Sequence, residues 1–307
     1  MSAVLDELAA GGVRLAIPLL LASAGELLSE RAGVLNLSVE GMMLTGAFAG
    51  AAGALASGSA LVGVGTALAA GLLVALVQAV LSVTLRADQI VTGITLNALA
   101  LGGTTYAARL LFGDGQAGSV PGFDPLPVPV LHEIPVVGPA LFEMSALGYA
   151  ACALTVALAV GCGRRTSWGL AVDAVGEDAR TADRCGLPVR AIRYATVLVT
   201  GAAAGLAGAQ LALSEVHAFS DNITAGIGYL AVVAVIAGRW RAWPTVVACL
   251  FFGVAQALQF AAPALGLHLS APLLTTLPYL FALLAVSGLV GRSRAPAGLT
   301  LPFARSA

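Results

Sequence analysis

Two clusters of polar residues stand at the start of apolar stretches, where they could hold a solute or a backbone group. Asn36 and Glu40 are four residues apart, which is the spacing of one helical face. Gln89, Thr92 and Asn97 can likewise share a face at the start of a later stretch. Such groups are costly in apolar surroundings unless they are hydrogen-bonded or functional. We expect these five residues to line a solute path; for Glu40, a structural hydrogen bond to a backbone donor of a broken helix is the open alternative.

A third cluster lies in the polar segment 164–193. Glu177 and Asp178 suit the first turn of a helix because they complement its dipole, and Gly186 and Pro188 are typical helix stops. The pattern predicts a short amphipathic helix over about 176–186, with a modest apolar stripe that includes Ala182. Such a helix could serve as a handle for another protein. Its candidate contact residues are Gly176, Glu177, Arg180, Ala182, Arg184 and Gly186.

No arrangement for catalysis or metal binding accompanies these clusters. The sequence lacks the GxxxxGK[ST] phosphate loop, so it has no ATP site of that kind. Its histidines, His132, His217 and His268, have no ligand spacing, and its four cysteines form no CxxC pair. We therefore predict that the chain is not an enzyme and holds no metal or cofactor.

The composition points to lipid as the surrounding solvent. Hydrophobic residues make up 59% of the 307 residues and charged residues only 10%, whereas a soluble domain carries about 25% charged residues. The net charge of -1 indicates no nucleic-acid partner. A core of this size could not hide so much apolar surface from water, so we expect an integral membrane protein.

Stretches long enough to cross a bilayer need about 20 mostly apolar residues. Nine candidates are present, at about 10–28, 37–57, 60–85, 90–112, 143–163, 194–215, 224–239, 243–262 and 271–291. The stretch 37–57 carries Glu40 and many small residues, so it could be a broken or re-entrant helix. We predict an all-α, polytopic bundle of about 8–10 spans that forms one membrane domain over residues 1–307.

The arginines predict the orientation. They gather in the connection 164–193, at Arg239 and Arg241, and in the C-terminal tail, whereas the alternate connections have none. Because basic loops stay in the cytoplasm, the C-terminus is expected inside and the segment 113–142 outside. That outer segment is rich in proline, so we expect an irregular cap and not a helix. It is either a plain connector or a docking surface for an extracytoplasmic partner.

Small residues form one face of the sixth stretch: Gly201, Ala204, Gly205, Gly208 and Ala209. Small faces let helix backbones approach closely. We expect this face to pack within the chain, with a subunit interface as the alternative.

Three segments carry a family resemblance: SERAGVLNLSVEGMMLTGAFAG, RADQIVTGITLNALALG and AVGEDARTADRCGLPVRAIRYATVLVTGAAAGLAGAQLAL. They resemble the permeases of ABC importers for simple sugars and nucleosides, within the wider family of ribose and branched-chain amino-acid permeases. The likeness runs from about Leu15 to Gly291, and the first segment resembles the nucleoside branch. The third resembles that family's coupling helix, with Asp178-Ala179 where Asn-Pro is common and Leu187 in place of Ile.

The resemblance implies a type II-like permease in a bacterial inner membrane, with the segment 164–193 as the loop that couples it to the ATPase. It also implies partners: ABC ATPase subunits, a second permease that is a longer paralogue, and an extracytoplasmic solute-binding lipoprotein. Nucleosides are the first expected solute and simple sugars the second. A secondary transporter or channel is the rival class, although the sequence has no buried Arg–Asp or Glu–His ladder for proton coupling.

Overall fold

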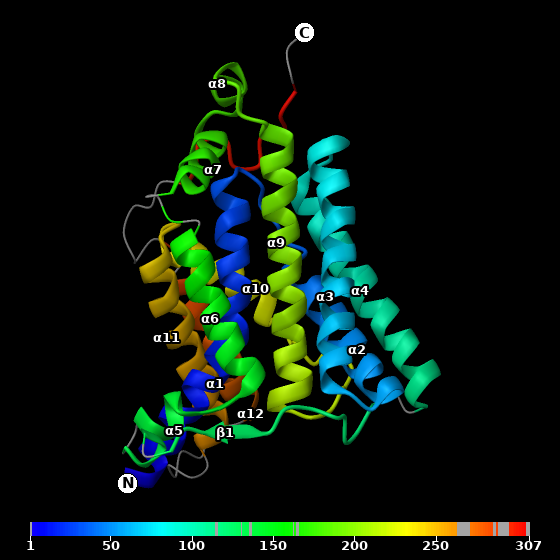
Figure 1. Ribbon diagram of the computed structural model, residues 1–307, viewed down its shortest axis with the longest axis vertical. Coiled ribbons are helices and arrows are strands. Elements are labelled where there is room, and N and C mark those ends of the chain that lie inside the picture. Colours follow the sequence, from blue (N-terminus) through cyan, green and yellow to red (C-terminus); the bar gives the residue numbers. More distant parts are fainter. Residues whose placement is uncertain are drawn as a thin grey trace.

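The computed structural model describes residues 2–113, 116–129, 131–134, 137–161, 163, 166–262, 271–284, 287 and 295–304. Its longer helices form a single bundle (Figure 1). They are α1 (Ser2–Arg31), α2 (Val39–Ser57), α3 (Ala60–Ala79), α4 (Gln89–Phe112), α6 (Ala146–Gly161), α9 (Val189–Gln210), α10 (Ile227–Ala237), α11 (Ala242–Ala261) and α12 (Ala271–Leu284). Each of the nine predicted stretches overlaps one of these helices, which confirms an all-α polytopic fold.

Within the part of the chain that the structure describes, five helical segments are long and apolar enough to cross a membrane. They are Glu7–Arg31, Val39–Ser57, Ala60–Thr84, Val189–Glu215 and Ala242–Ala261, the third and fourth of which end in π-helical turns, Val80–Thr84 and Leu211–Glu215. Helix α2 is continuous over 19 residues, so the break considered for 37–57 is absent. The break lies at α10 instead. With 11 residues, α10 is about 17 Å long and cannot cross alone, so the prediction of a full span over 224–239 was wrong.

Helix α1 occupies the centre of the bundle and packs extensively on α9 and α11, while α3 packs on both α2 and α9. The small face of α9 makes these contacts possible. A Cβ atom at Gly208 would lie 2.1 Å from the Met43 carbonyl oxygen, and one at Gly205 would lie 2.6 Å from that of Ala67. These glycines therefore pack within the chain, as the sequence predicted.

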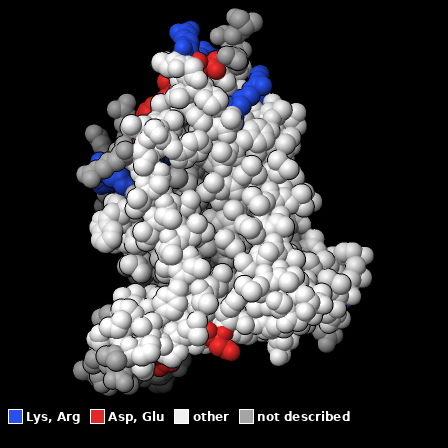
Figure 2. Space-filling model, viewed as in Figure 1, with Lys and Arg blue, Asp and Glu red and all other residues white. Residues whose placement is uncertain are grey.

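The two ends of the bundle differ in structure and charge. Two short helices, α7 (Ser167–Glu177) and α8 (Ala179–Arg184), lie at the end that also holds the described C-terminal tail, and the N-terminus lies at the other end (Figure 1). In the view of Figure 2, basic side chains appear only towards the α7–α8 end, and the middle of the bundle is free of charged atoms. This distribution fits a membrane-spanning middle.

The predicted outer segment is more ordered than an irregular cap. It contains a 3-10 turn (Leu131–Glu133), α5 (Val137–Leu141) and strand β1 (Pro125–Pro127), which pairs antiparallel with β2 (Glu143–Ser145) in the register Leu126 to Met144. The expectation that this segment holds no helix was therefore wrong. Strand β2 also takes the first residues of the predicted fifth stretch.

Candidate solute path and coupling end

Helix α10 begins in the middle of the bundle, after a segment whose backbone turns sharply. Asn222, Ala225 and Gly226 all have positive φ values, of 56°, 43° and 90°. Such values are rare outside glycine, so surrounding contacts must hold this segment in place. The helix therefore starts with free backbone N–H groups inside the protein, where water cannot satisfy them.

Glu40 supplies the acceptors for these groups. Its Oε1 accepts hydrogen bonds from Thr224 Oγ1 at 2.6 Å and from the Gly226 amide at 2.8 Å, and its Oε2 accepts one from the Gly228 amide at 2.7 Å. The carboxylate also complements the positive end of the α10 dipole. A Cβ atom at Gly228 would lie 2.5 Å from Glu40 Cα, so this close approach requires glycine. The first turn of α2 thus caps α10.

Asn97 joins α4 to the same region. Its Oδ1 accepts a hydrogen bond from the Gly41 amide at 2.7 Å, and its Nδ2 donates to the Leu37 carbonyl and to the Tyr229 hydroxyl, both at 2.8 Å. One turn earlier, a Cβ atom at Gly93 would lie 2.7 Å from Leu37 Cβ. Asn97 therefore connects α4, the start of α2 and the first turn of α10.

Gln89 shares the buried face of α4 with Asn97, but Thr92 does not. Gln89 Oε1 accepts a hydrogen bond from the Leu35 amide at 2.8 Å. The Thr92 hydroxyl bonds only to carbonyls of its own helix, Asp88 and Gln89. Thr92 is half-buried and lies about 100° around the helix from position 93, so it stands at the edge of this face and not on the line through 89, 93 and 97.

Asn36 lies in the turn before α2, so it does not share a helical face with Glu40 as the spacing had suggested. Its Oδ1 accepts from the Ser38 hydroxyl at 2.6 Å and its Nδ2 contacts the Met42 sulfur at 3.7 Å. The backbone N–H of Asn36 donates to Glu26 Oε1 at 2.9 Å. The turn is thus held by side chains from both adjoining helices.

Two buried carboxylates of α1, Glu26 and Glu30, were missed at the sequence level. Both are fully buried. Glu30 Oε2 accepts a hydrogen bond from Trp240 Nε1 at 2.5 Å, which joins α1 to the turn between α10 and α11. Their one-turn spacing within an apolar helix was the available signal. With Glu40 they tie α1, α2 and α10 together.

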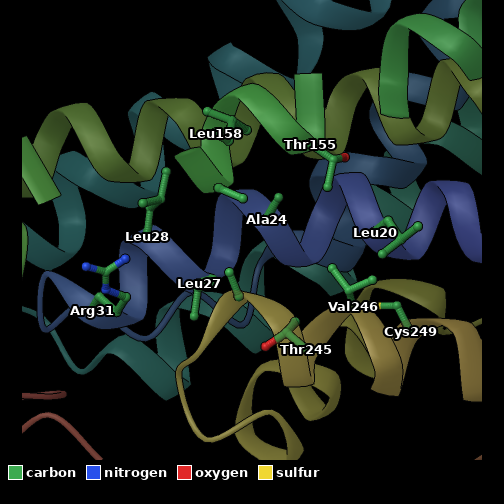
Figure 3. Close-up of a pocket in the computed structure, with 12 residues that line it drawn as sticks. Leu20, Ala24, Leu27, Leu28, Arg31, Thr155, Leu158, Thr245, Val246 and Cys249 are labelled. Carbon is green, nitrogen blue, oxygen red and sulfur yellow. The ribbon is translucent and has the colours of Figure 1, made fainter. Parts of the chain in front are cut away.

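A crevice between α1, α6 and α11 offers no room for a solute. Figure 3 shows it between Leu20, Leu158 and Val246, with Arg31 at one end. Its volume of about 30 Å³ is roughly that of one water molecule in the liquid, and its lining is almost entirely apolar.

The predicted helix 176–186 is in fact the junction of two helices. Glu177 ends α7 and Asp178 is the N-cap residue of α8, where its carboxylate accepts from the amides of Arg180 and Thr181 and from the Thr181 hydroxyl. These hydrogen bonds hold the pKa of Asp178 below its usual value, and the bond from the Thr181 hydroxyl has the largest effect. The placement of Glu177 in the first turn of one helix was therefore wrong.

The six candidate contact residues fall into two groups. Glu177, Arg180, Arg184 and Gly186 are exposed, whereas Ala182 and Gly176 are buried. Ala182 packs in a small apolar cluster with Ala32, Val172, Val175, Val189, Ile192 and Phe303. Gly176 lies inside α7, and a Cβ atom there would lie 1.8 Å from the Arg31 carbonyl oxygen. An ion pair between Arg31 Nε and Asp173, at 2.7 Å, also joins α1 to α7.

The C-terminal tail, residues 295–304, lies across α7 and α9. The Gly298 amide donates to the Gly176 carbonyl at 2.8 Å, and Phe303 enters the Ala182 cluster. Arg193, which is 2% exposed, donates to the carbonyls of Ala32 at 3.2 Å and Leu301 at 3.0 Å. Nothing in the sequence pattern had indicated this docking. The tail is thereby joined to α7, α8 and α9.

These features define a polytopic helical membrane protein with a short internal helix. The sequence matches the family of branched-chain amino acid transport system permease components over residues 8–287, and the chain belongs to this family. No solved structure is significantly similar to it.

Relatives are permeases of ABC transporters for two kinds of solute. The chain is 40% identical over 268 residues to the putative glucose ABC transporter permease TsgC13 of Haloferax volcanii, covering 85% of this chain and 80% of the relative. It is 34% identical over 300 residues to the guanosine ABC transporter permease NupQ of Bacillus subtilis, covering 94% and 93%. It is 31% identical over 288 residues to the nucleoside ABC transporter permease NupC of Lactococcus lactis, covering 91% and 90%. The chain is therefore an ABC transporter permease, a transport subunit.

Proposed function

We propose that this chain forms half of the membrane path of a nucleoside importer that separate ATPase subunits drive. The observation that carries the choice of a neutral solute is the cap on α10. The N-terminus of a half-helix in a membrane protein is a natural site for an anionic solute. Here Glu40 fills that position with a carboxylate of the chain itself. A neutral solute rich in hydrogen-bonding groups, such as a nucleoside, suits this arrangement, and the guanosine and nucleoside permeases among the relatives support it. A simple sugar, as in the name of TsgC13, is the second candidate.

Five residues were candidates for the path, and their contacts suggest how they act. Asn36, Glu40, Gln89 and Asn97 hold the turn before α2 and the start of α10 through buried hydrogen bonds. We propose that they position the break in the path. Thr92, bonded within its own helix, has the weakest claim to a role.

The helix α8 is the proposed contact for the ATPase. Its buried side, Ala182, is seated on α7, α9 and the tail, and its exposed side presents Arg180 and Arg184. A push on α8 would pass to α1 through the close contact of Gly176 with the Arg31 carbonyl. The second permease, a longer paralogue, and a solute-binding lipoprotein complete the proposed assembly in a bacterial inner membrane.

Reconstitution tests the proposed function. Proteoliposomes that hold this chain, its sister permease and the ATPase, with ATP enclosed and the binding protein outside, are expected to accumulate radiolabelled guanosine. Vesicles with the chain alone are expected to accumulate none. Accumulation by the chain alone, without ATP, would instead establish a secondary transporter or channel.

We propose that the C-terminus and α8 lie in the cytoplasm, because the arginine-rich connections are expected there. Gly118 is in open space in the outer segment, and Cys185 is exposed after α8. In intact cells, Gly118→Cys is expected to react with a membrane-impermeant maleimide, and Cys185 only after permeabilisation. The other three native cysteines are replaced by alanine where Cys185 is labelled, and all four are replaced in the Gly118→Cys variant. Labelling of Cys185 in sealed cells would reverse the topology.

A further inference from the structure

A cavity of about 490 Å³ lies beside the first turn of α10, a size within the range of small-molecule sites. Ala225 and Ile227 line it and flank Gly226, the residue whose amide binds Glu40. The rest of its lining comes from α1, α11 and α12, from the π-helical turn after α9 and the segment that follows it, and from Leu230 of α10. The cavity therefore borders the place where α10 begins inside the bundle.

Three polar side chains line this cavity. Gln256 and Gln259 lie three residues apart on α11, so they share one side of that helix. The Gln256 Nε2 atom is buried and has no hydrogen-bond partner among the described residues. Glu215, at the end of the π-helical turn, accepts a hydrogen bond from Gln210 through Oε1 at 3.0 Å, which leaves Oε2 for another donor. A buried donor without a partner is unfavourable, and a ligand with an acceptor at this place would relieve it.

Aromatic and aliphatic groups form the remaining walls. Phe260 and Tyr279 supply ring faces, and Leu15, Leu211 and Leu230 supply apolar surface. The Tyr279 hydroxyl donates to the Ala225 carbonyl, so its ring is held against the segment that precedes α10. Flat heteroaromatic bases pack well on such rings.

We propose that this cavity is the permease's own nucleoside site. Gln256 and Gln259 would bind acceptors on the base, Glu215 would accept from the ribose hydroxyls, and the rings of Phe260 and Tyr279 would cover the base. A hexose has no planar base for these rings. This assignment rests on the proposed function and specifies where the solute binds between release from the binding protein and passage past α10.

The test uses the assembled transporter in detergent and the photoreactive probe 8-azidoguanosine. Labelling of this chain is expected on peptides of α11 or α12, and guanosine but not glucose should compete with it. Gln256→Leu is expected to reduce labelling at subsaturating probe about tenfold, the effect of one lost hydrogen bond at the upper end of its usual range. Gln116→Leu, the same substitution at an exposed residue outside the cavity, should leave labelling unchanged. ATP hydrolysis without solute by the Gln116→Leu transporter should also match that of the parent.

Two other results would overturn the assignment in different ways. If the transporter accumulates guanosine but the label falls outside the cavity, or Gln256→Leu labels normally, the site is wrong and the proposed function stands. If the complex accumulates glucose and not guanosine, and Gln256→Leu lowers glucose uptake, the cavity is a solute site but the proposed nucleoside class is wrong.

Discussion

Replacing Glu40 by alanine is expected to remove most of the folded protein from the membrane. The Thr224 hydroxyl and the Gly226 and Gly228 amides would all lose their acceptor inside the bundle. Each buried group left unsatisfied costs about 1–3 kcal/mol, and the whole fold is stable by only about 5–15 kcal/mol. Glu40→Gln should have a smaller effect. The amide oxygen of glutamine can still accept hydrogen bonds from these donors, and only the bond to the other carboxylate oxygen is lost, because an NH₂ group there would face a donor. The measurement is the amount of protein in the membrane and its thermal stability in detergent.

The matched control for this prediction is Glu143→Gln. Glu143 is a partly exposed carboxylate that pairs with Arg14 at 3.7 Å, and exposed pairs contribute only about 0–1 kcal/mol. This variant should be as stable as the parent. A structural role for Glu40 would be contradicted if Glu40→Ala accumulated and melted normally but transported nothing. Glu40 would then contact the solute directly, and its hydrogen bonds to α10 would not be needed for folding.

The positions of the helices and the close-packing face of α9 could be predicted, because both depend on residues close together in the sequence. Twenty apolar residues in a row identify a span, and glycine at 201, 205 and 208 identifies a face for close packing. The family resemblance likewise rests on contiguous segments. These local signals sufficed for the class of protein.

The start of α10 inside the bundle could not be predicted, because the residue that caps this helix is distant in the sequence. Glu40 and Gly228 are 188 residues apart, and only the folded chain brings them together. The residues of α10 itself are strongly apolar, so the stretch 224–239 resembles a full span in the sequence. The cavity depends in the same way on Gln256 and Tyr279, which come from different helices.

The structure of α7 and α8 was predicted only in outline, also because some of its contacts are distant in the sequence. Asp178 and Gly186 are local signals, and they correctly predicted a helix between them. Helix α7 was not predicted, although Thr166 caps its N-terminus by accepting a hydrogen bond from the Gly169 amide. The docking of Phe303 beside Ala182 joins residues more than a hundred positions apart. No periodicity in the tail reveals such a contact.

Replacing Ala182 by arginine is expected to abolish uptake while the chain stays in the membrane. Ala182 is 4% exposed within the cluster that seats α8, and an arginine there would place a long, charged side chain among apolar residues. Helix α8 would leave its seat, whereas the spans below it keep their contacts. The measurements are guanosine uptake and the amount of ATPase that co-purifies, both of which should fall.

Ala174→Arg provides the matched control, because Ala174 is exposed on neighbouring α7. It adds the same charge at the same end of the molecule without disturbing the cluster. Uptake and ATPase co-purification should remain close to those of the parent. Normal uptake by Ala182→Arg, at normal expression, would show that the seating of α8 has no part in coupling.

The claim that ATP energy enters through α8 is tested most directly by cross-linking from Cys185, the exposed residue that follows this helix. A benzophenone maleimide is attached to Cys185 in the assembled transporter, with the other cysteines replaced by alanine. Illumination is expected to join this chain to the ATPase subunit, and the same reagent at Gly118→Cys should give no such product. Cross-linking to the ATPase from position 118 but not from Cys185 would contradict the proposed coupling role of α8.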